Sequence, residues 1–341
     1  MARPHKPVAA VLGGGMWGVV LAQQLSAKAR VRLWEFVPSL ADALAKTRRH
    51  AHIPGFRLDD SVRVGHDLAA ACADAEVLLF VLPSHAMARA TRDVRAKARL
   101  SPRALAVNAS KGVEPRTLAT MGDIVARELP ALRGKVWTLT GPSFAREVAR
   151  GVPTGLMLGG PLGPRADRLA ALFESGSLSV QPWPDRVGVE LGGSLKNVIA
   201  IGAGILDGLG AGANTKAALL VRGLAEMGLI IRAAGGRADT IYGLAGLGDL
   251  IATGTSPESR NRAFGEKLGR GLSPRRALSQ IPTVVEGVEA ADSARSLARR
   301  HKVRTPLLDA IFDAAGGEPA RGVLTALGFR WGEHGERRQE R

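Results

Sequence analysis

The chain has 341 residues, more than one hydrophobic core usually accommodates, so we expect two domains. Hydrophobic residues make up 45% and charged residues 23%, values typical of a soluble globular protein. The formal net charge of +16 suggests a nucleic-acid or membrane-surface partner, but the surplus is mostly arginine scattered along the chain, and aromatic residues are only 4%. Compositional bias explains the charge more simply, so we expect no nucleic-acid partner.

The single cysteine, Cys72, excludes an intramolecular disulfide and a cysteine-based zinc site. A lone thiol fits a reducing compartment, and we expect a cytoplasmic protein without a metal cofactor. Glycines 13–15 interrupt the apolar run near the N-terminus, which argues against a signal peptide. The most apolar stretch, 198–220, contains Asp207 and Lys216, so we expect no membrane span.

The first element is a short apolar strand at 7–12, followed by a G-x-G-x-x-G turn and a helix that continues through 19–25. In this setting Gly13 would make the turn, Gly15 would let the backbone approach a pyrophosphate, and Gly18 would let the helix pack on the strand. The helix N-terminus would supply free amides for the phosphates. The pattern predicts dinucleotide binding.

A second strand, 31–34, ends at Glu35, where an acid in this type of domain binds the adenosine ribose and repels a 2′-phosphate. The next residue is Phe36, not an arginine that would accept that phosphate. The sequence therefore favours NAD over NADP, although Arg32 or Arg48 could reach round to the ribose.

Strands and helices continue to alternate, which predicts a Rossmann-like doubly wound parallel sheet. Two residues stand at the carboxyl ends of strands, where such sheets bind ligands: His85 after 76–82 and Lys111 after 105–110. We interpret His85 as a loop residue beside the cofactor rather than as an acid or base. The further strands are expected at 62–64, 136–140, 154–158 and 178–181.

After residue 184, strand-like runs nearly vanish and helical runs dominate. We expect a dinucleotide-binding domain over 1–186, a helical domain over 187–335, and a disordered tail over 336–341. The helices are expected at 187–206, 216–234, 262–268, 274–280, 289–300 and 306–314.

Lys196 lies in the first of these helices, among glycines and aliphatic residues. A buried lysine can have its pKa lowered toward neutrality and transfer protons, but a lysine seen alone more often extends its ammonium to solvent. The surrounding glycines suggest clearance for a ligand or another backbone. Two polar segments, 246–249 and 259–262, are interpreted as loops; in the second, Arg260 and Asn261 could bind a phosphate, or Ser259 could simply cap a surface helix.

Eight short motifs are distributed along nearly the whole chain. They are Gly13-Gly-Gly-Met-Trp-Gly18, Pro83-Ser-His-Ala86, Ser110-Lys-Gly-Val-Glu114, Gly141-Pro-Ser-Phe-Ala145, Glu190-Leu-Gly-Gly-Ser-Leu-Lys196, Gly243-Leu-Ala-Gly-Leu-Gly-Asp249, Ser259-Arg-Asn-Arg262 and Val284-Val-Glu-Gly287. Each is modest alone, but the ordered set resembles the bacterial NAD(P)-dependent glycerol-3-phosphate dehydrogenase family.

The resemblance implies interconversion of dihydroxyacetone phosphate and sn-glycerol 3-phosphate, which feeds phospholipid synthesis. It implies proton exchange by Lys196 with the substrate's C2 oxygen, and an Asp249 that holds both this lysine and the substrate hydroxyl. Lys111 would touch both substrate and cofactor. The remaining substrate contacts implied are Gly141, Ser143, Ser259, Arg260 and Asn261. The remaining cofactor contacts implied are Met16, Trp17, Ala145, Arg260, Val284 and Glu286.

Three positions depart from the family pattern. Gly14 replaces a common alanine and Gly254 a common cysteine, and neither change is expected to matter, whereas Phe36 replaces a common basic residue and weakens the case for NADP. The runner-up is a Rossmann-plus-helical dehydrogenase of a hydroxy acid, of the hydroxyisobutyrate or ketopantoate type. A basic nucleic-acid-binding or nucleotide-sensing protein is the alternative outside enzymes. We also expect a homodimer.

Overall fold

The computed structural model describes residues 6–281 and 284–330. The chain divides into two compact units. Unit 1 comprises Met1–Lys111 and Ala119–Glu190, and unit 2 comprises Gly112–Leu118 and Leu191–Arg341. Segment 112–118 therefore interrupts unit 1 in the sequence, an arrangement that no sequence pattern announced. The predicted tail, 336–341, lies outside the described residues.

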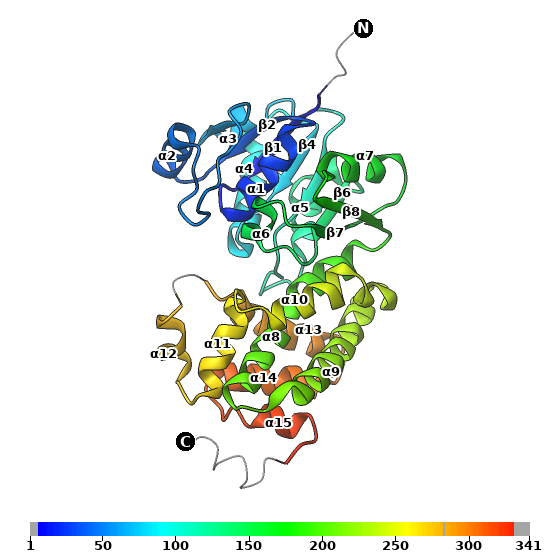
Figure 1. The fold of residues 1–341 in the computed structure, drawn as a ribbon. Helices are drawn as coiled ribbons and strands as arrows, with labels where there is room; N and C mark the ends of the chain where they lie inside the picture. The colour runs from blue at the N-terminus through cyan, green and yellow to red at the C-terminus, as the bar shows by residue number, and fades with distance from the viewer. Residues whose placement is uncertain (1–5, 282–283, 331–341) are drawn as a thin grey trace. The chain divides into compact units, whose positions relative to one another are not determined.

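Unit 1 is built on one sheet of eight strands in the order β3-β2-β1-β4-β5-β6-β7-β8 (Figure 1). The strands are β1 Val8–Leu12, β2 Arg30–Trp34, β3 Arg63–Gly65, β4 Val77–Phe80, β5 Leu105–Asn108, β6 Val136–Thr140, β7 Thr154–Gly159 and β8 Leu178–Trp183. This order, with β1 next to both β2 and β4, confirms the predicted doubly wound architecture.

One strand pair departs from the predicted parallel sheet. β6 and β7 run antiparallel, with Thr138 opposite Gly159 and Thr140 opposite Met157. Two antiparallel neighbouring strands can be joined without a long crossover connection. The connection from β6 to β7 accordingly contains only the short helix α6, Ala145–Ala149. All other neighbouring strands are parallel.

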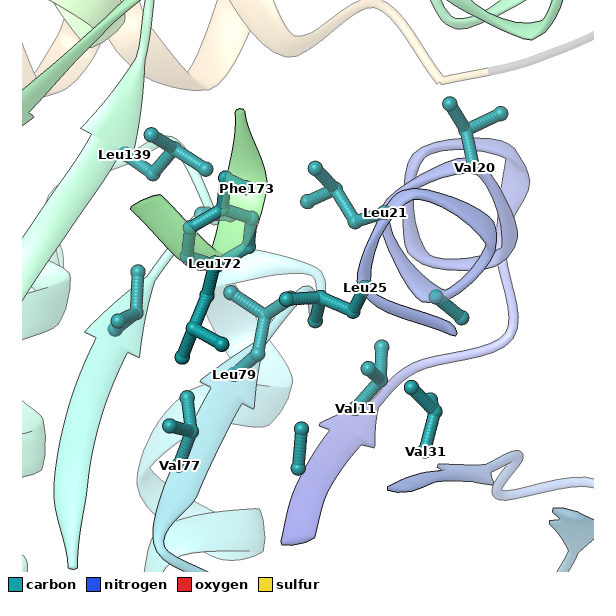
Figure 2. Packing of buried hydrophobic residues seen from close by; sticks show 14 of the residues in the cluster. Val11, Val20, Leu21, Leu25, Val31, Val77, Leu79, Leu139, Leu172 and Phe173 are labelled. Carbon is teal, nitrogen blue, oxygen red and sulfur yellow. The ribbon is translucent and has the colours of Figure 1, made fainter. Parts of the chain in front are cut away.

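The two faces of this sheet carry separate hydrophobic clusters, because successive strand residues point to opposite faces. Val77 and Leu79 of β4 belong to one cluster, with α1 and α7. Leu78 and Phe80 belong to the other, with α3, α4 and α5. Figure 2 shows Leu25 of α1 and Phe173 of α7 beside Leu79 in the first cluster. The helices of unit 1 are α1 Met16–Ser26, α2 Pro38–Thr47, α3 Leu68–Cys72, α4 Ser84–Lys97, α5 Met121–Glu128, the 3-10 turn η1 Pro130–Leu132, α6 Ala145–Ala149 and α7 Pro164–Phe173.

Unit 2 is helical wherever it forms regular structure within the described residues. The long helix α8, Arg186–Gly208, begins in unit 1 and continues into unit 2. The other helices are α9 Gly212–Ala233, η2 Ala238–Tyr242, η3 Leu244–Gly248, α10 Asp249–Thr255, α11 Arg260–Gly269, α12 Pro274–Ser279, α13 Glu286–Arg300, α14 Pro306–Gly316 and α15 Gly322–Ala326. The sequence patterns missed α10 and α15, which are short and lie beside glycines that interrupt an apolar period.

Helix α8 is the one helix of the described chain that is long and apolar enough to cross a membrane by length and composition, although it contains charged residues such as Glu190 and Lys196. Its apolar window is entirely buried inside the protein, as in the core helix of a soluble protein. The stretch singled out in the sequence, 198–220, is not one helix, because the chain turns between Gly208 and Gly212.

The glycines of α8 serve mainly to let other protein segments approach closely. A Cβ atom at Gly204 would overlap the carbonyl oxygen of Arg262, and one at Gly208 would overlap that of Glu266. A Cβ atom at Gly192 would lie 2.9 Å from the carbonyl oxygen of Ala245. These positions therefore allow close backbone packing within unit 2 and do not depend on a ligand for their explanation.

Candidate active site

The glycine-rich turn after β1 has three distinct steric roles in unit 1. Gly13 has φ +120°, and a Cβ atom there would overlap the carbonyl oxygen of Val81. A Cβ atom at Gly18 would overlap the carbonyl oxygen of Gly13. Gly15, the N-cap of α1, has nothing within 4 Å of its missing Cβ. Gly13 and Gly18 thus allow close backbone packing around the turn. Gly15 leaves open space at the N-terminus of α1, which fits a pyrophosphate.

Glu35 follows β2 and binds the same turn. Its Oε2 accepts a hydrogen bond from the Gly14 N–H at 3.1 Å, and its Oε1 accepts one from the Val37 N–H at 2.9 Å. A Cβ atom at Gly14 would lie only 2.6 Å from Oε2. The glycine at position 14 therefore accommodates the Glu35 carboxylate, and an alanine there would require that carboxylate to shift.

His50, which the sequence patterns did not single out, also lies close to this turn. Burial lowers the pKa of His50, and the neighbouring His52 lowers it further, while Gly14 and Glu35 oppose the shift. The ring centroids of the two histidines are 5.8 Å apart.

His85, by contrast, is exposed and lies in the first turn of α4, so its interpretation as a loop residue was wrong.

Three residues implied as cofactor contacts meet in one apolar cluster of unit 1. Met16 and Trp17, in the first turn of α1, and Ala145, at the start of α6, are partly buried against it. Gly141 and Ser143 lie just beyond β6, where the Ser143 hydroxyl donates to the Gly141 carbonyl oxygen at 3.0 Å. Their position beyond the carboxyl end of a strand is where this type of sheet binds ligands.

Lys111 follows β5, three residues after its last residue, Asn108, and its side chain is half-buried. The parallel strands β1, β4, β5 and β6 end at one edge of the sheet, so Lys111 belongs to the same edge as the glycine-rich turn. Unit 1 therefore places the glycine-rich turn, Glu35 and Lys111 at the same edge of the sheet.

In unit 2, Lys196 of α8 has its ammonium inside the protein rather than in solvent. Its Nζ lies 2.9 Å from Oδ1 of Asp249 and also donates to the Thr253 hydroxyl. The side chains of Lys196 and Asp249 are only 7% and 4% exposed. A buried ammonium is tolerated when a carboxylate pairs with it, as Asp249, the first residue of α10, does here. The structure thus rules out the snorkelling interpretation.

Thr253 is a member of this cluster that sequence reasoning missed. Its hydroxyl also donates to Asp249 Oδ1, at 3.2 Å. The four-residue spacing from Asp249 places both residues on one helix face, but that signal was hidden because 246–249 was interpreted as a loop. In the structure 244–248 is a π-helical turn that leads directly into α10, and the cluster follows from that continuity.

The segment 259–262 is the start of α11 rather than a loop. Ser259 caps the helix, since its hydroxyl accepts from the Arg262 N–H at 3.2 Å, but it is buried rather than a surface cap. The Asn261 carboxamide is also buried, donating to Asn197 Oδ1 at 2.9 Å and accepting from the Gly287 N–H at 2.9 Å.

Arg260 keeps a partly exposed guanidinium, 3.8 Å from the Glu286 carboxylate. The structure therefore brings together two residues that were implied as cofactor contacts from different motifs. Val284, two residues before Glu286, is exposed. Among residues 6–281 and 284–330, no group of three or more His, Cys, Asp or Glu side chains is arranged to hold a metal ion.

Comparisons with known proteins cover both units. A family described as NAD-dependent glycerol-3-phosphate dehydrogenase N-terminus matches residues 8–161, and the corresponding C-terminus matches residues 185–319. A protein named glycerol-3-phosphate dehydrogenase (NAD(P)+) from Trichlorobacter lovleyi is 40% identical over 321 residues, which are 93% of this chain and 96% of that protein.

The solved structure of glycerol-3-phosphate dehydrogenase from Coxiella burnetii has a TM-score of 0.88 and 32% identity, covering 96% of this chain and 100% of that chain. A ketopantoate reductase from Ralstonia eutropha reaches only a TM-score of 0.53 and 18% identity, over 86% of this chain and 99% of that chain, a likeness of fold alone. The matches favour the predicted family over the hydroxy-acid alternative. The chain belongs to the NAD-dependent glycerol-3-phosphate dehydrogenase family.

Proposed function

We propose that this protein interconverts dihydroxyacetone phosphate and sn-glycerol 3-phosphate with a nicotinamide dinucleotide. The curated relative at 40% identity is named for this activity. The single observation that carries the proposal is the buried pair of Lys196 and Asp249 at 2.9 Å, because a hydroxyl–ketone conversion needs a proton donor and acceptor in a dry site.

The chemistry follows from where charge develops. The nicotinamide, when bound, supplies the hydride to C2 of the ketone. Reduction leaves negative charge on the C2 oxygen, which Lys196 neutralises by donating a proton. Asp249 and Thr253 hold the ammonium in place through the contacts described above. Lys111 adds a second cation near the reacting oxygen.

The remaining roles are assigned by unit. We propose that Gly13, Gly15 and Gly18 form the pyrophosphate turn, and that Met16, Trp17 and Ala145 line the dinucleotide. Gly141 and Ser143 contact the substrate. In unit 2, Ser259, Arg260 and Asn261 bind the substrate phosphate, with Arg260, Val284 and Glu286 also near the cofactor. The helix start at Ser259 and the exposed guanidinium of Arg260 support this assignment. Binding of the remote phosphate orients C2 for reaction.

We propose NAD(H) as the preferred cofactor. The support is Glu35, whose carboxylate is held at the end of β2 by two main-chain N–H groups. A carboxylate at this place binds ribose hydroxyls and repels a 2′-phosphate. We further propose that the protein works in the cytoplasm, supplies glycerol 3-phosphate for phospholipid synthesis, and forms a homodimer.

A spectrophotometric assay tests the proposal directly. Oxidation of NADH and NADPH is followed with dihydroxyacetone phosphate, ketopantoate and hydroxyisobutyrate-type keto acids as substrates. We expect dihydroxyacetone phosphate to be preferred over the keto acids by at least about a hundredfold in kcat/KM, because only it carries a phosphate for Arg260. Comparable rates on both classes would refute the proposal.

A further inference from the structure

Unit 1 contains a buried carboxylate, Glu190, for which the proposed chemistry has no use. Its side chain is 2% exposed, on α8. One oxygen, Oε1, accepts three hydrogen bonds: from Thr138 Oγ1 at 2.7 Å, the Gly122 N–H at 2.7 Å and Asn108 Nδ2 at 2.9 Å. The other oxygen, Oε2, pairs with Arg186. We call these five residues the Glu190 cluster; it joins β5, β6, α5 and α8.

Asn108 extends this cluster to the residue immediately before Lys111. Its Nδ2 also donates to the Ser110 carbonyl oxygen at 3.0 Å, and its Oδ1 accepts from the Ser110 N–H at 2.9 Å. The Ser110 hydroxyl in turn accepts from the Leu82 N–H at 2.7 Å. Both main-chain polar groups of Ser110 and its side chain are therefore bonded, which sets the direction in which the chain leaves toward Lys111.

The polarity of Glu190 decides which way the Asn108 amide is turned. A carboxylate only accepts hydrogen bonds, so the amide must present its NH₂ group to Glu190 and its oxygen to the Ser110 N–H. Glutamine at 190 would have one acceptor oxygen for two sets of donors. It would direct an NH₂ group either at three donors or at the Arg186 guanidinium, leaving a buried polar group unsatisfied.

The cluster is closely packed around Gly122. A Cβ atom at Gly122 would lie 2.6 Å from Glu190 Oε1 and would overlap the Arg186 guanidinium. Arg186 is itself held on the far side by Asp123 and by Thr120, whose hydroxyl lies at 3.1 Å. The bonds that fix Asn108 thus continue through Glu190 and Arg186 to Thr120 and Asp123 at the start of α5.

We propose that Glu190 is a positioning residue: through Asn108 and Ser110 it fixes the main chain that places Lys111 for the reaction. The inference rests on the proposed function, in which Lys111 touches substrate and cofactor. Glu190 itself is buried and bonded to protein groups on both oxygens, so it acts only through the segment that it holds.

The test compares E190Q with the control E76Q. Glu76 is also a buried carboxylate of unit 1 with an arginine partner, Arg168 at 2.9 Å, but it precedes β4 at the opposite, amino-terminal edge of the sheet. We expect E190Q to lower kcat/KM for dihydroxyacetone phosphate by about tenfold to a hundredfold, as misplacement of a reacting group does. E76Q should lower the melting temperature without a comparable loss of activity.

A double-mutant cycle with K111M separates positioning from general destabilisation. If Glu190 acts through Lys111, E190Q should cause little further loss of kcat/KM once Lys111 has been replaced. N108A keeps the other hydrogen bonds of Glu190 but removes the hydrogen bonds that hold Ser110. It should therefore reproduce the loss of kcat/KM seen in E190Q and the dependence of that loss on Lys111. This variant replaces E190Q in the test if E190Q folds poorly.

Losses that multiply independently in the cycle, or an E190Q that retains activity as E76Q does, would overturn the inference. Wild-type protein that oxidises neither NADH nor NADPH with dihydroxyacetone phosphate would instead refute the proposed function. The two failures are therefore distinguished by the wild-type rate.

Discussion

The two units build their candidate sites from different materials. In unit 1 the glycine-rich turn offers main-chain amides, and its geometry depends on the absence of side chains at Gly13 and Gly18, while Gly15 leaves the space beside the amides open. In unit 2 the site depends on side chains that meet across helices, Lys196 from α8 with Asp249 from α10. A backbone site tolerates little change of shape, whereas a side-chain site tolerates little change of charge.

The energetic consequences differ accordingly. An overlap at Gly18 would force the strand and helix apart, because backbone atoms cannot move aside as a flexible side chain does. Removing one partner of a buried ion pair leaves the other charge without compensation, at a cost of about 3–5 kcal/mol. The glycine-rich turn of unit 1 is therefore most sensitive to added volume, and the Lys196–Asp249 pair of unit 2 is most sensitive to a lost partner.

The largest expected effect is on turnover in unit 2. We expect Lys196→Ala to lower kcat by more than about a hundredfold while the Kd of NADH stays nearly unchanged, because proton transfer is lost and the dinucleotide turn is intact. Steady-state kinetics and NADH fluorescence titration measure the two quantities. Lys216→Ala is the control, since Lys216 also pairs with an aspartate, Asp207, but lies on α9. Unchanged turnover in Lys196→Ala would remove the central assignment.

The backbone site is tested by Gly15→Ala. The apoprotein has space for this methyl group, so the melting temperature should hold, but the methyl group would occupy the approach to the pyrophosphate. We expect the Kd of NADH to rise by about tenfold or more. Gly176→Ala is the control, because its missing Cβ also has nothing within 4 Å. A Gly15→Ala protein that binds NADH as the wild type does would contradict the assignment of the turn.

Cofactor preference should respond to the acid beside that turn. We expect wild-type protein to prefer NADH, and Glu35→Gln to shift the NADH to NADPH ratio of kcat/KM toward NADPH by about tenfold, because a like-charge repulsion is removed. Gly14→Ala should shift it in the same direction, since the methyl group would displace the Glu35 carboxylate. A wild-type preference for NADPH would refute the assignment of Glu35.

The smallest effect expected is on the pH dependence of stability, where the units differ in sign. Burial lowers the pKa of His50 in unit 1, so the unfolded chain binds the proton more readily and stability falls as pH drops below about 6.5. Burial raises the pKa of Glu226 in unit 2, although the N–H groups of Leu307 and Leu308 donate to its carboxylate. Its contribution to stability is therefore lost as pH rises above about 4.5.

Melting temperatures recorded from pH 4 to pH 8 for His50→Gln and Glu226→Gln test these signs. His50→Gln should flatten the decline on the acid side of neutrality, and Glu226→Gln should remove a decline in melting temperature that appears as pH rises above about 4.5. If the melting temperatures of both variants change with pH as those of the wild type do, neither His50 nor Glu226 contributes to the pH dependence of stability.

Much of unit 1 was predictable because its signals are local. A buried strand, a turn that only glycine permits and a following helix occupy consecutive residues, so Gly13, Gly15 and Gly18 could be assigned from spacing alone. The antiparallel β7 was not predictable, since strand direction depends on how the chain returns through space rather than on residue alternation.

The helical character of unit 2 was predictable, but helix α10 and the side-chain contacts of Lys196 were not. The pattern of apolar residues located α8, α9, α13 and α14, whereas α10 was hidden by the glycines of 243–248. The partnership of Lys196 with Asp249 was implied by family resemblance, and the membership of Thr253 was not anticipated at all.

By itself the sequence determined the doubly wound sheet, the place of the dinucleotide turn and the family, because hydrophobic periodicity and motif order can be read directly from the order of the residues. Only the tertiary structure decided that Lys196 ends on buried partners, that Gly14 makes room for the Glu35 carboxylate, and that α8 glycines admit other backbones. These facts depend on contacts between residues tens of positions apart, and burial and pairing are properties of the folded chain, not of its spacing.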